Sequence, residues 1–514
     1  MLNNLQGSRM HRYTLIASTL LLATATAAAS AQQPKAVSVV SAISTDPPKA
    51  VATQPQPWKK IPIPALHDFH PAQPRKITLA NGLVLFLQED HELPFINGSI
   101  LIRGGSRDEP AAKLGLVSLY GQTWRTSGTA TTSGDALDEL LDRKAASVET
   151  GGGSATTSVR WSSLKPDFDQ IFAITLDVLL HPDFKADKLA LAKRQATAGI
   201  ARRNDDAAGI AAREATFLAY GKLSPYARQV EYASINSVEL SDLTTWHSAT
   251  VAPNNMIVAI SGDFDSATME AKARTAFDAL PKGIPAATLS TTFPDPRPGV
   301  YFVPKTDVNQ SNVYLVGLGT ERSNPDYYAL SVMNEIFSGG FGSRVFQSVR
   351  TRLGLAYSVG GSYGASYDHP GMFTVGASTK SASTIAATRA MLDEIGRLKS
   401  VPPTTAELSS AKDQVLNSFI FNYDSKEKTL GEQVTLALYG YPSDYLDKYK
   451  TGIEHVTAAD VTRVANKYID ASKLAIVIVG NSADFGGPLS TLGPVTNLDI
   501  TIPAPPAPAS APAK

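Results

Sequence analysis

The strongest constraint on the fold of this chain is an internal repeat, because its two halves run through the same order of expected elements. Each half continues from two strands and a helix to one more strand and two long amphipathic helices, and closes on a short helix and an apolar strand. The opening elements are 82–90, 97–106 and the helical run from Leu114 in the first half, and 299–307, 311–320 and 327–337 in the second. Such a duplication predicts two similar domains rather than one large core.

The repeat predicts an α+β fold of two homologous domains, each a mostly antiparallel sheet packed with long helices. We expect the first domain at residues 76–281 and the second at 299–485. A linker at 282–298 separates them, because this stretch contains four prolines and no apolar period. Residues 32–75 and 486–514 are rich in proline and alanine, which predicts a flexible lead-in and a tail.

Residues 1–31 have the composition of a secretory signal peptide. Basic residues near the start precede an apolar stretch, and Ala29-Ser30-Ala31 forms a cleavage site of the small-x-small type. The apolar stretch is short and rich in alanine and threonine, so we expect a cleaved signal rather than a membrane anchor. The chain has no cysteine, which excludes disulfides and thiolate metal sites and fits export to a bacterial periplasm.

The charge balance bears on possible partners, because 47 basic residues face 47 acidic ones. A chain without a basic excess has no general attraction for nucleic acid or for an anionic membrane surface. We therefore expect neither as a partner.

Each half contains its own motifs in a fixed order. The first half contains GGSRDEP, DVLLHPDF and YGKLSPYARQV, and then VAPNNMIVAISGDFD. The second contains DVNQSNVYLVGLG and the long run DYYALSVMNEIFSGGFGSRVFQSVRTRLGLAYSVG. In content, order and spacing, nearly all of residues 77–485 resembles the pitrilysin/insulinase family of zinc metallopeptidases. The resemblance implies a metallopeptidase-like half-chamber, in which two domains pair with two more that, in many bacterial members, belong to a second chain.

The zinc motif of that family is missing here. The resemblance aligns H-x-x-E-H with Ser118, Gly121 and Gln122, and the third ligand with Gly199. None of these residues supplies the imidazoles or carboxylates that bind Zn²⁺ and activate its water. We therefore expect no catalytic residue, no metal and no cofactor in this chain alone, with zinc in a partner subunit. His247 lies in a helical segment among packing residues, which indicates a structural histidine.

The second half contains residues that resemble the family's substrate-binding groups. Arg350 and Tyr357 stand seven apart, as does an arginine–tyrosine pair that faces the zinc across the chamber in active members. A guanidinium and a phenol can bind peptide backbone and stabilise an oxyanion. Gly339 and Gly340 belong to a glycine-rich segment, which is either a plain turn between helices or a loop over the chamber. We also expect 154–159, after a run of three glycines, to be an edge strand of the kind that accepts peptides in this family.

These observations predict a non-catalytic, substrate-binding subunit of a periplasmic heteromeric zinc peptidase. A homologous zinc-bearing subunit and peptides would be its partners. A stand-alone peptide-binding pseudoenzyme or scaffold, including a homodimer, is the first alternative. An active hydrolase with an unconventional site is the second.

Overall fold

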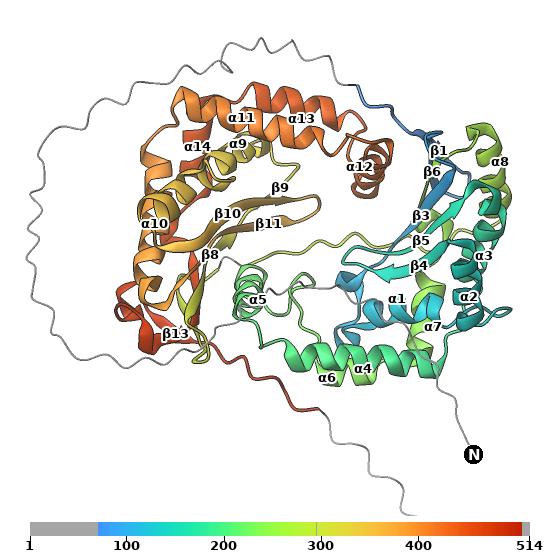
Figure 1. Ribbon diagram of the computed structural model, residues 1–514, viewed down its shortest axis with the longest axis horizontal. Coiled ribbons are helices and arrows are strands. Elements are labelled where there is room, and N and C mark those ends of the chain that lie inside the picture. Colours follow the sequence, from blue (N-terminus) through green and yellow to red (C-terminus); the bar gives the residue numbers. More distant parts are fainter. Residues whose placement is uncertain (1–69, 295, 506–514) are drawn as a thin grey trace, which may run out of the picture. The chain divides into compact units, whose positions relative to one another are not determined.

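The structure is a computed structural model that describes residues 70–294 and 296–505. The predicted signal peptide at 1–31 and almost all of the lead-in lie outside the described residues. The rest forms two sheets with many helices (Figure 1), so the predicted α+β class is confirmed.

The first sheet has six strands in the order β1-β2-β6-β3-β5-β4. β2 and β6 are parallel, and the other neighbours are antiparallel. The strands are β1 Arg75–Thr78, β2 Val84–Glu89, β3 Phe95–Arg103, β4 Ser147–Gly152, β5 Thr156–Leu164 and β6 Met256–Gly262. The expected edge strand at 154–159 is wrong, because this segment mostly belongs to β5, which lies between β3 and β4. The edge is β4, and it contains the first two of the three glycines.

The second sheet has seven strands in the order β13-β7-β12-β8-β11-β10-β9. They are β7 Gly299–Pro304, β8 Gln310–Leu318, β9 Thr320–Glu321, β10 Ala356–Ser366, β11 Pro370–Lys380, β12 Ala475–Gly480 and β13 Val495–Asn497. The run β7-β12-β8-β11-β10 repeats β2-β6-β3-β5-β4 of the first sheet. In both runs the parallel pair joins the first strand of the run to the last long strand of that half. The internal repeat in the sequence is therefore a repeat of topology.

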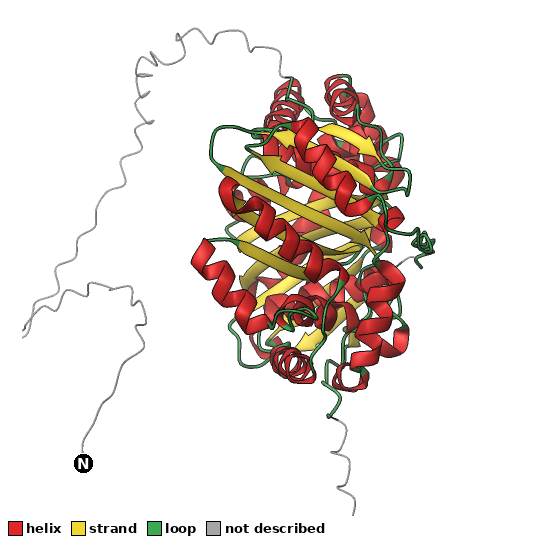
Figure 2. Cartoon of the chain, turned by 90° about the vertical axis from the view of Figure 1, so that its right-hand side faces the viewer, coloured by secondary structure: helices red, strands yellow, loops and turns green. Residues whose placement is uncertain are grey.

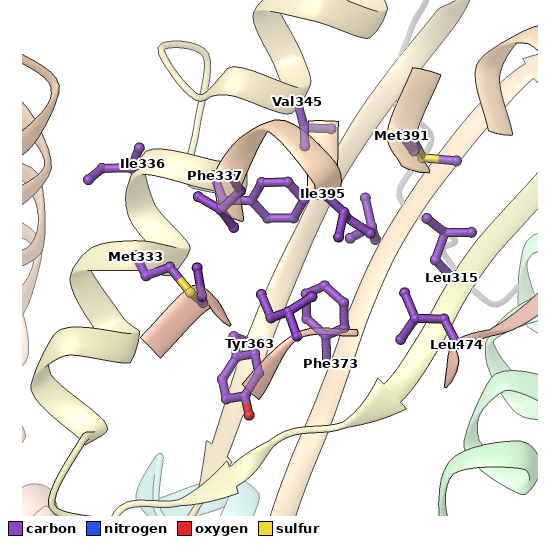
Figure 3. Close-up of a cluster of buried hydrophobic side chains, with 14 of the residues drawn as sticks. Leu315, Met333, Ile336, Phe337, Val345, Tyr363, Phe373, Met391, Ile395 and Leu474 are labelled. Atoms are coloured by element: carbon purple, nitrogen blue, oxygen red, sulfur yellow. The ribbon is translucent and has the colours of Figure 1, made fainter. Parts of the chain in front are cut away.

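A layer of helices covers one face of each sheet (Figure 2, helices in red and strands in yellow). Alternate residues such as Ile96, Ile100 and Ile102 of β3 point into the first core, as period-two patterning requires. The first core is covered by α1 Leu116–Thr126, α2 Gly134–Lys144, α3 Phe168–Leu180, α4 Ala186–Arg202, α6 Tyr232–Ser237, α7 Leu240–Thr250 and α8 Ser266–Phe277. The second core is covered by α9 Tyr327–Ser338, α10 Thr384–Ser400, α11 Thr405–Ile420, α13 Tyr445–Glu454 and α14 Ala458–Tyr468. Figure 3 shows its centre, where Phe337, Phe373 and Ile395 meet.

Each half also contributes one helix to the opposite face of the other half's sheet. α5 (Ala207–Tyr220) belongs to the first half but packs on β8 and β12, where Val316, Val477 and Val479 point toward it. α12 (Lys426–Tyr439) belongs to the second half but packs on β2 and β6, against Phe86, Ile257 and Ala259. This exchange explains why every residue of β6 and β12 is buried, because both faces of these strands are covered.

The two ends of α12 are bound by residues of the first half. At its beginning, the Nζ atom of Lys426 lies 3.2 Å from a carboxylate oxygen of Asp90. At its end, the Arg103 side chain donates a hydrogen bond to the carbonyl oxygen of Ala437 at 3.5 Å. A cation at this end interacts favourably with the negative end of the helix dipole. The described residues accordingly belong to one compact unit.

The chain after residue 485 departs from the expected tail. Instead of leaving the fold, it forms β13, which pairs in parallel with β7. Leu498 and Ile500 then pack beside α5, and Ile502 packs against the first core. The composition of 486–514 predicted a flexible segment because it counts proline and alanine and overlooks these three apolar side chains. The end of the second domain at 485 therefore needs correction, since the described chain remains packed to Ile502.

Candidate functional site

The degenerate zinc positions lie on α1, whose start is fixed by Glu109. The Glu109 carboxylate accepts the backbone N–H groups of Gly115 at 3.0 Å and Val117 at 2.6 Å, which satisfies the first turn of the helix. Ser118 and Gln122 are one turn apart and exposed on the same face. These two side chains bind each other, because the Gln122 side-chain amide donates a hydrogen bond to the Ser118 hydroxyl at 3.1 Å.

The position of the missing base is closed as well as substituted. Gly121 is buried against the edge strand β4, and a Cβ atom placed on it would lie 2.5 Å from the backbone nitrogen of Gly152. The Thr150 hydroxyl donates to the carbonyl oxygen of Gly121 at 2.7 Å and accepts the N–H of Arg125 at 3.1 Å. It thus bridges two groups of α1 that stand four residues apart. A glutamate at 121 would have to displace β4.

Zinc does not fit these positions. Gly199 is exposed on α4, which packs on α1, and it has no side chain to offer. A serine hydroxyl and a carboxamide that bond each other are poor replacements for two imidazoles. Within residues 70–294 and 296–505, no group of three or more histidine, aspartate or glutamate side chains is arranged to hold a metal ion.

The predicted substrate-binding pair is brought together by the structure. Arg350 lies on a π-helix, Phe346–Arg352, and Tyr357 follows at the start of β10. The Arg350 guanidinium carbon lies 5.6 Å from the centre of the Tyr357 ring and 4.9 Å from that of Phe346. Both members of the pair are exposed, with 79% of Tyr357 accessible. π-helices are rare and frequent at functional sites, and nothing in the local sequence predicted this one.

The glycine-rich segment is a turn that leads from α9 into the π-helix. Gly340 has φ of +72°, a left-handed conformation that favours glycine. A Cβ atom on Gly339 would overlap the Glu335 carboxylate beneath it. Phe341 at the tip of the turn is 75% exposed, and its ring meets the Phe346 ring edge-on at 4.9 Å. Gly339 and Gly340 therefore place the Phe341 ring against Phe346, the ring that Arg350 also contacts.

Arg344 anchors this segment to the helical layer. Its side chain binds the Glu407 carboxylate at 2.7 and 3.1 Å and donates to the carbonyl oxygen of Val401 at 2.9 Å. The Arg344 guanidinium is the main reason why the pKa of Glu407 falls to about 2. This two-point contact fixes Arg344, which stands two residues before the start of the π-helix.

A cavity of about 600 Å³ lies apart from the π-helix, between α12 and the face of the first sheet that α12 covers. The sequence analysis missed its polar lining, although alternate polar positions in β3, beginning with Asn97 and Ser99, were a usable signal. The charged and polar lining residues include Asn97, Ser99, Glu149, Arg160, Ser162, Ser261, Glu427 and Thr435. Because α12 comes from the other half, its roof could not be assigned from sequence.

His247 is structural, as predicted. Its Nδ1 atom lies 2.9 Å from the Tyr120 hydroxyl, and its ring lies edge-on to Trp124 at 5.3 Å. Burial lowers the pKa of His247 to about 4, so the imidazole is neutral at neutral pH.

Several known proteins are similar to this chain. Residues 237–415 match the family model described as the peptidase M16 inactive domain. An uncharacterized zinc protease of Rickettsia bellii is 23% identical over 414 residues, which are 79% of this chain and 97% of that protein. A non-peptidase homolog, YmxG, of Helicobacter pylori is 23% identical over 399 residues, covering 77% of this chain and 91% of that protein.

Solved structures show the same fold. The peptidase M16 inactive domain from Pseudomonas fluorescens has a TM-score of 0.72 and 25% identity, covering 80% of this chain and 98% of that one. A protease from Helicobacter pylori has a TM-score of 0.67 at 19% identity, over 80% of this chain and all of that one. The fold resembles that of a peptidase M16 inactive domain, and the zinc-binding positions of the zinc metallopeptidases are substituted in this chain. Residues 237–415 thus match the peptidase M16 inactive domain, and most of the chain is similar to relatives named as zinc proteases, which confirms the resemblance found in its sequence.

None of the helices in the described part of the chain combines the length and apolarity that a membrane crossing requires.

Proposed function

We propose that this chain is the non-catalytic, substrate-binding subunit of a periplasmic heteromeric zinc peptidase. A homologous partner would supply the zinc, its ligands and the base. This chain would supply Arg350 and Tyr357, which complete the partner's site by binding the backbone of a peptide substrate. Proteolysis would then be a property of the complex.

One contrast carries this proposal. The half of the chain that resembles the catalytic half of an M16 peptidase cannot hold the metal, because Gly121 is packed against β4 and Ser118 is bonded to Gln122. The other half presents an exposed guanidinium and an exposed phenol side by side. An oxyanion donor of this kind has little use without an electrophilic centre opposite it. A second subunit would provide that centre.

The proposal predicts which proteins accompany this chain in its host. Affinity purification of the tagged chain from a periplasmic extract, followed by mass spectrometry, should recover a homologue with H-x-x-E-H. The purified chain alone should bind no stoichiometric zinc and cleave no peptide. One tightly bound zinc per chain, lost together with peptidase activity on chelation, would show that the chain is an enzyme by itself.

The role of the pair can be tested in the reconstituted complex. Arg350→Ala should lower kcat/KM by about 10²–10³, because a lost oxyanion donor typically costs that much. Tyr357→Phe should lower it in the same way. Arg350→Lys should restore little, since an ammonium lacks the planar fork of donors. Arg352→Lys is the matched control, because this arginine lies on the same π-helix but bonds Ser348 at 2.7 Å. If Arg350→Ala cleaves at the wild-type rate, the site assignment is wrong.

A further inference from the structure

Arg350 differs from its arginine neighbours in having no partner of opposite charge. Arg344 is bound to Glu407, and Arg352 donates to Ser348 and lies 3.9 Å from Glu394. Among the described residues, no carboxylate approaches Arg350 within ion-pair distance, and no protein oxygen accepts a hydrogen bond from it. Its contacts are the two rings of Phe346 and Tyr357. All five N–H donors of this guanidinium are therefore available to a ligand.

Aromatic rings lie beside this guanidinium, and a third ring packs against one of them. Phe341 and Tyr357 are 75% and 79% exposed, and Phe346 contacts both Phe341 and Arg350. Exposed aromatic rings of this size gathered around one charge are typical of a binding surface. The rings also orient the guanidinium plane, which lowers the entropy lost when a planar anion binds it.

We propose that this chain alone binds the C-terminal carboxylate of short peptides whose last side chain is apolar. The carboxylate would pair with the Arg350 fork through two parallel hydrogen bonds, and the last side chain would lie on the rings of Phe341 and Tyr357. This inference rests on the proposed function for the peptide nature of the ligand. The unpaired charge of Arg350 and the aromatic rings indicate the terminal carboxylate and the apolar last side chain. The site would thus recognise the end of a peptide before any partner joins.

The test compares two forms of one probe on the full mature chain. Acetyl-Ala-Ala-Phe is titrated as the free acid and as the C-terminal amide, with ligand-observed NMR as the readout. We expect the acid to bind about tenfold or more tightly than the amide, as a charged hydrogen-bonded pair warrants. Arg350→Gln should abolish this difference, and Arg352→Gln should preserve it. Replacing the last phenylalanine of the probe by glycine should lower the affinity of the chain for the acid. Phe341→Ser should remove this preference for phenylalanine over glycine.

Three outcomes would overturn the proposal. Equal affinity for acid and amide would mean that the terminal carboxylate is not recognised. An unchanged preference in Arg350→Gln would place the site elsewhere. Decanoate binding as tightly as the peptide acid would mean that the surface recognises any carboxylate with an apolar chain. The acid–amide comparison on the wild-type chain is independent of whether a variant folds.

A second assay separates this proposal from the proposed function. The reconstituted complex is given a long peptide with an amidated C-terminus. If Arg350→Ala abolishes its cleavage while the isolated chain binds acid and amide equally, the subunit role stands and terminal recognition fails. If the isolated chain prefers the acid but cleavage ignores Arg350→Ala, terminal recognition stands and the subunit role fails.

Discussion

At the scale of single residues, Gly121 determines whether the metal site could be restored, because its position has no room for a side chain. A substituted motif can in principle be restored by mutation, but here the space for the base is filled by the backbone of β4. The metal site is therefore closed because α1 packs too near to β4 to leave room for the base. Thr150 of β4 holds the two elements together by hydrogen bonds with both Gly121 and Arg125.

The triple variant Ser118→His, Gly121→Glu, Gln122→His should bind no zinc and should unfold at a lower temperature than the wild type. Gly121→Ala alone should lower the free energy of unfolding by about 1–3 kcal/mol, the usual cost of overpacking. Gly199→Ala is the control, because it lies in a helix with nothing within 4 Å, and it should raise that free energy by roughly 0.5–1 kcal/mol. Thermal and urea unfolding with metal analysis measure these effects. Stoichiometric zinc in a stable triple variant would contradict the closed-site interpretation.

His247 makes the stability of the chain depend on pH. Its pKa is about 4 in the folded protein and about 6.5 when unfolded, so the unfolded state binds more protons between these values. Stability should be complete above pH 6.5, fall as the pH drops, and reach its lower level near pH 4. The loss should be roughly 2–3 kcal/mol.

Urea unfolding at several pH values checks this slope. His247→Phe should flatten it, and His181→Gln, which changes an exposed histidine paired with Asp177, should not. A slope that persists in His247→Phe would assign the acid sensitivity to other groups.

At the scale of elements, the exchanged helices are the feature on which stability should depend most unexpectedly. Leu430 of α12 is buried on a sheet that belongs to the other half of the chain. Leu430→Ala should cost about 2–4 kcal/mol and should increase hydrogen exchange in β6, which α12 covers. Leu223→Ala, at a side chain that is 90% exposed, should change neither. If Leu430→Ala leaves β6 fully protected, α12 does not stabilise the first sheet.

The elements also show what local sequence can predict. The periodicity predicted one more strand and long amphipathic helices after the opening of each half, and β5 and α3 are such elements, because their burial follows a regular period of two or 3.6 residues. It could not predict the π-helix around Arg350, since that winding depends on the anchoring of Arg344 and the turn at Gly340. The pairing of Arg350 with Tyr357 was expected only from the family resemblance. β13 was missed because parallel pairing with β7 leaves no mark in a three-residue strand.

At the scale of the whole molecule, the two halves share cores. The second face of each sheet is covered by a helix from the other half, and the last residues cross from β7 to the first core at Ile502. Neither half should therefore fold independently. Residues 76–281 or 299–502, expressed alone, should show the spectroscopic signs of incomplete packing, such as lost near-ultraviolet circular dichroism. A cooperative unfolding transition for either fragment would contradict this.

The exchange of α5 and α12 has a consequence for the covalent chain itself. If a protease site is built between Ser290 and Thr291 and then cleaved, the two fragments should elute together from a size-exclusion column and separate only in denaturant. Co-expressed fragments should likewise complement each other, as in a split reporter. The linker would then serve to ensure that both halves are synthesised in equal amounts, and it would not be needed to hold them together. A gene broken at this point could still encode a working protein.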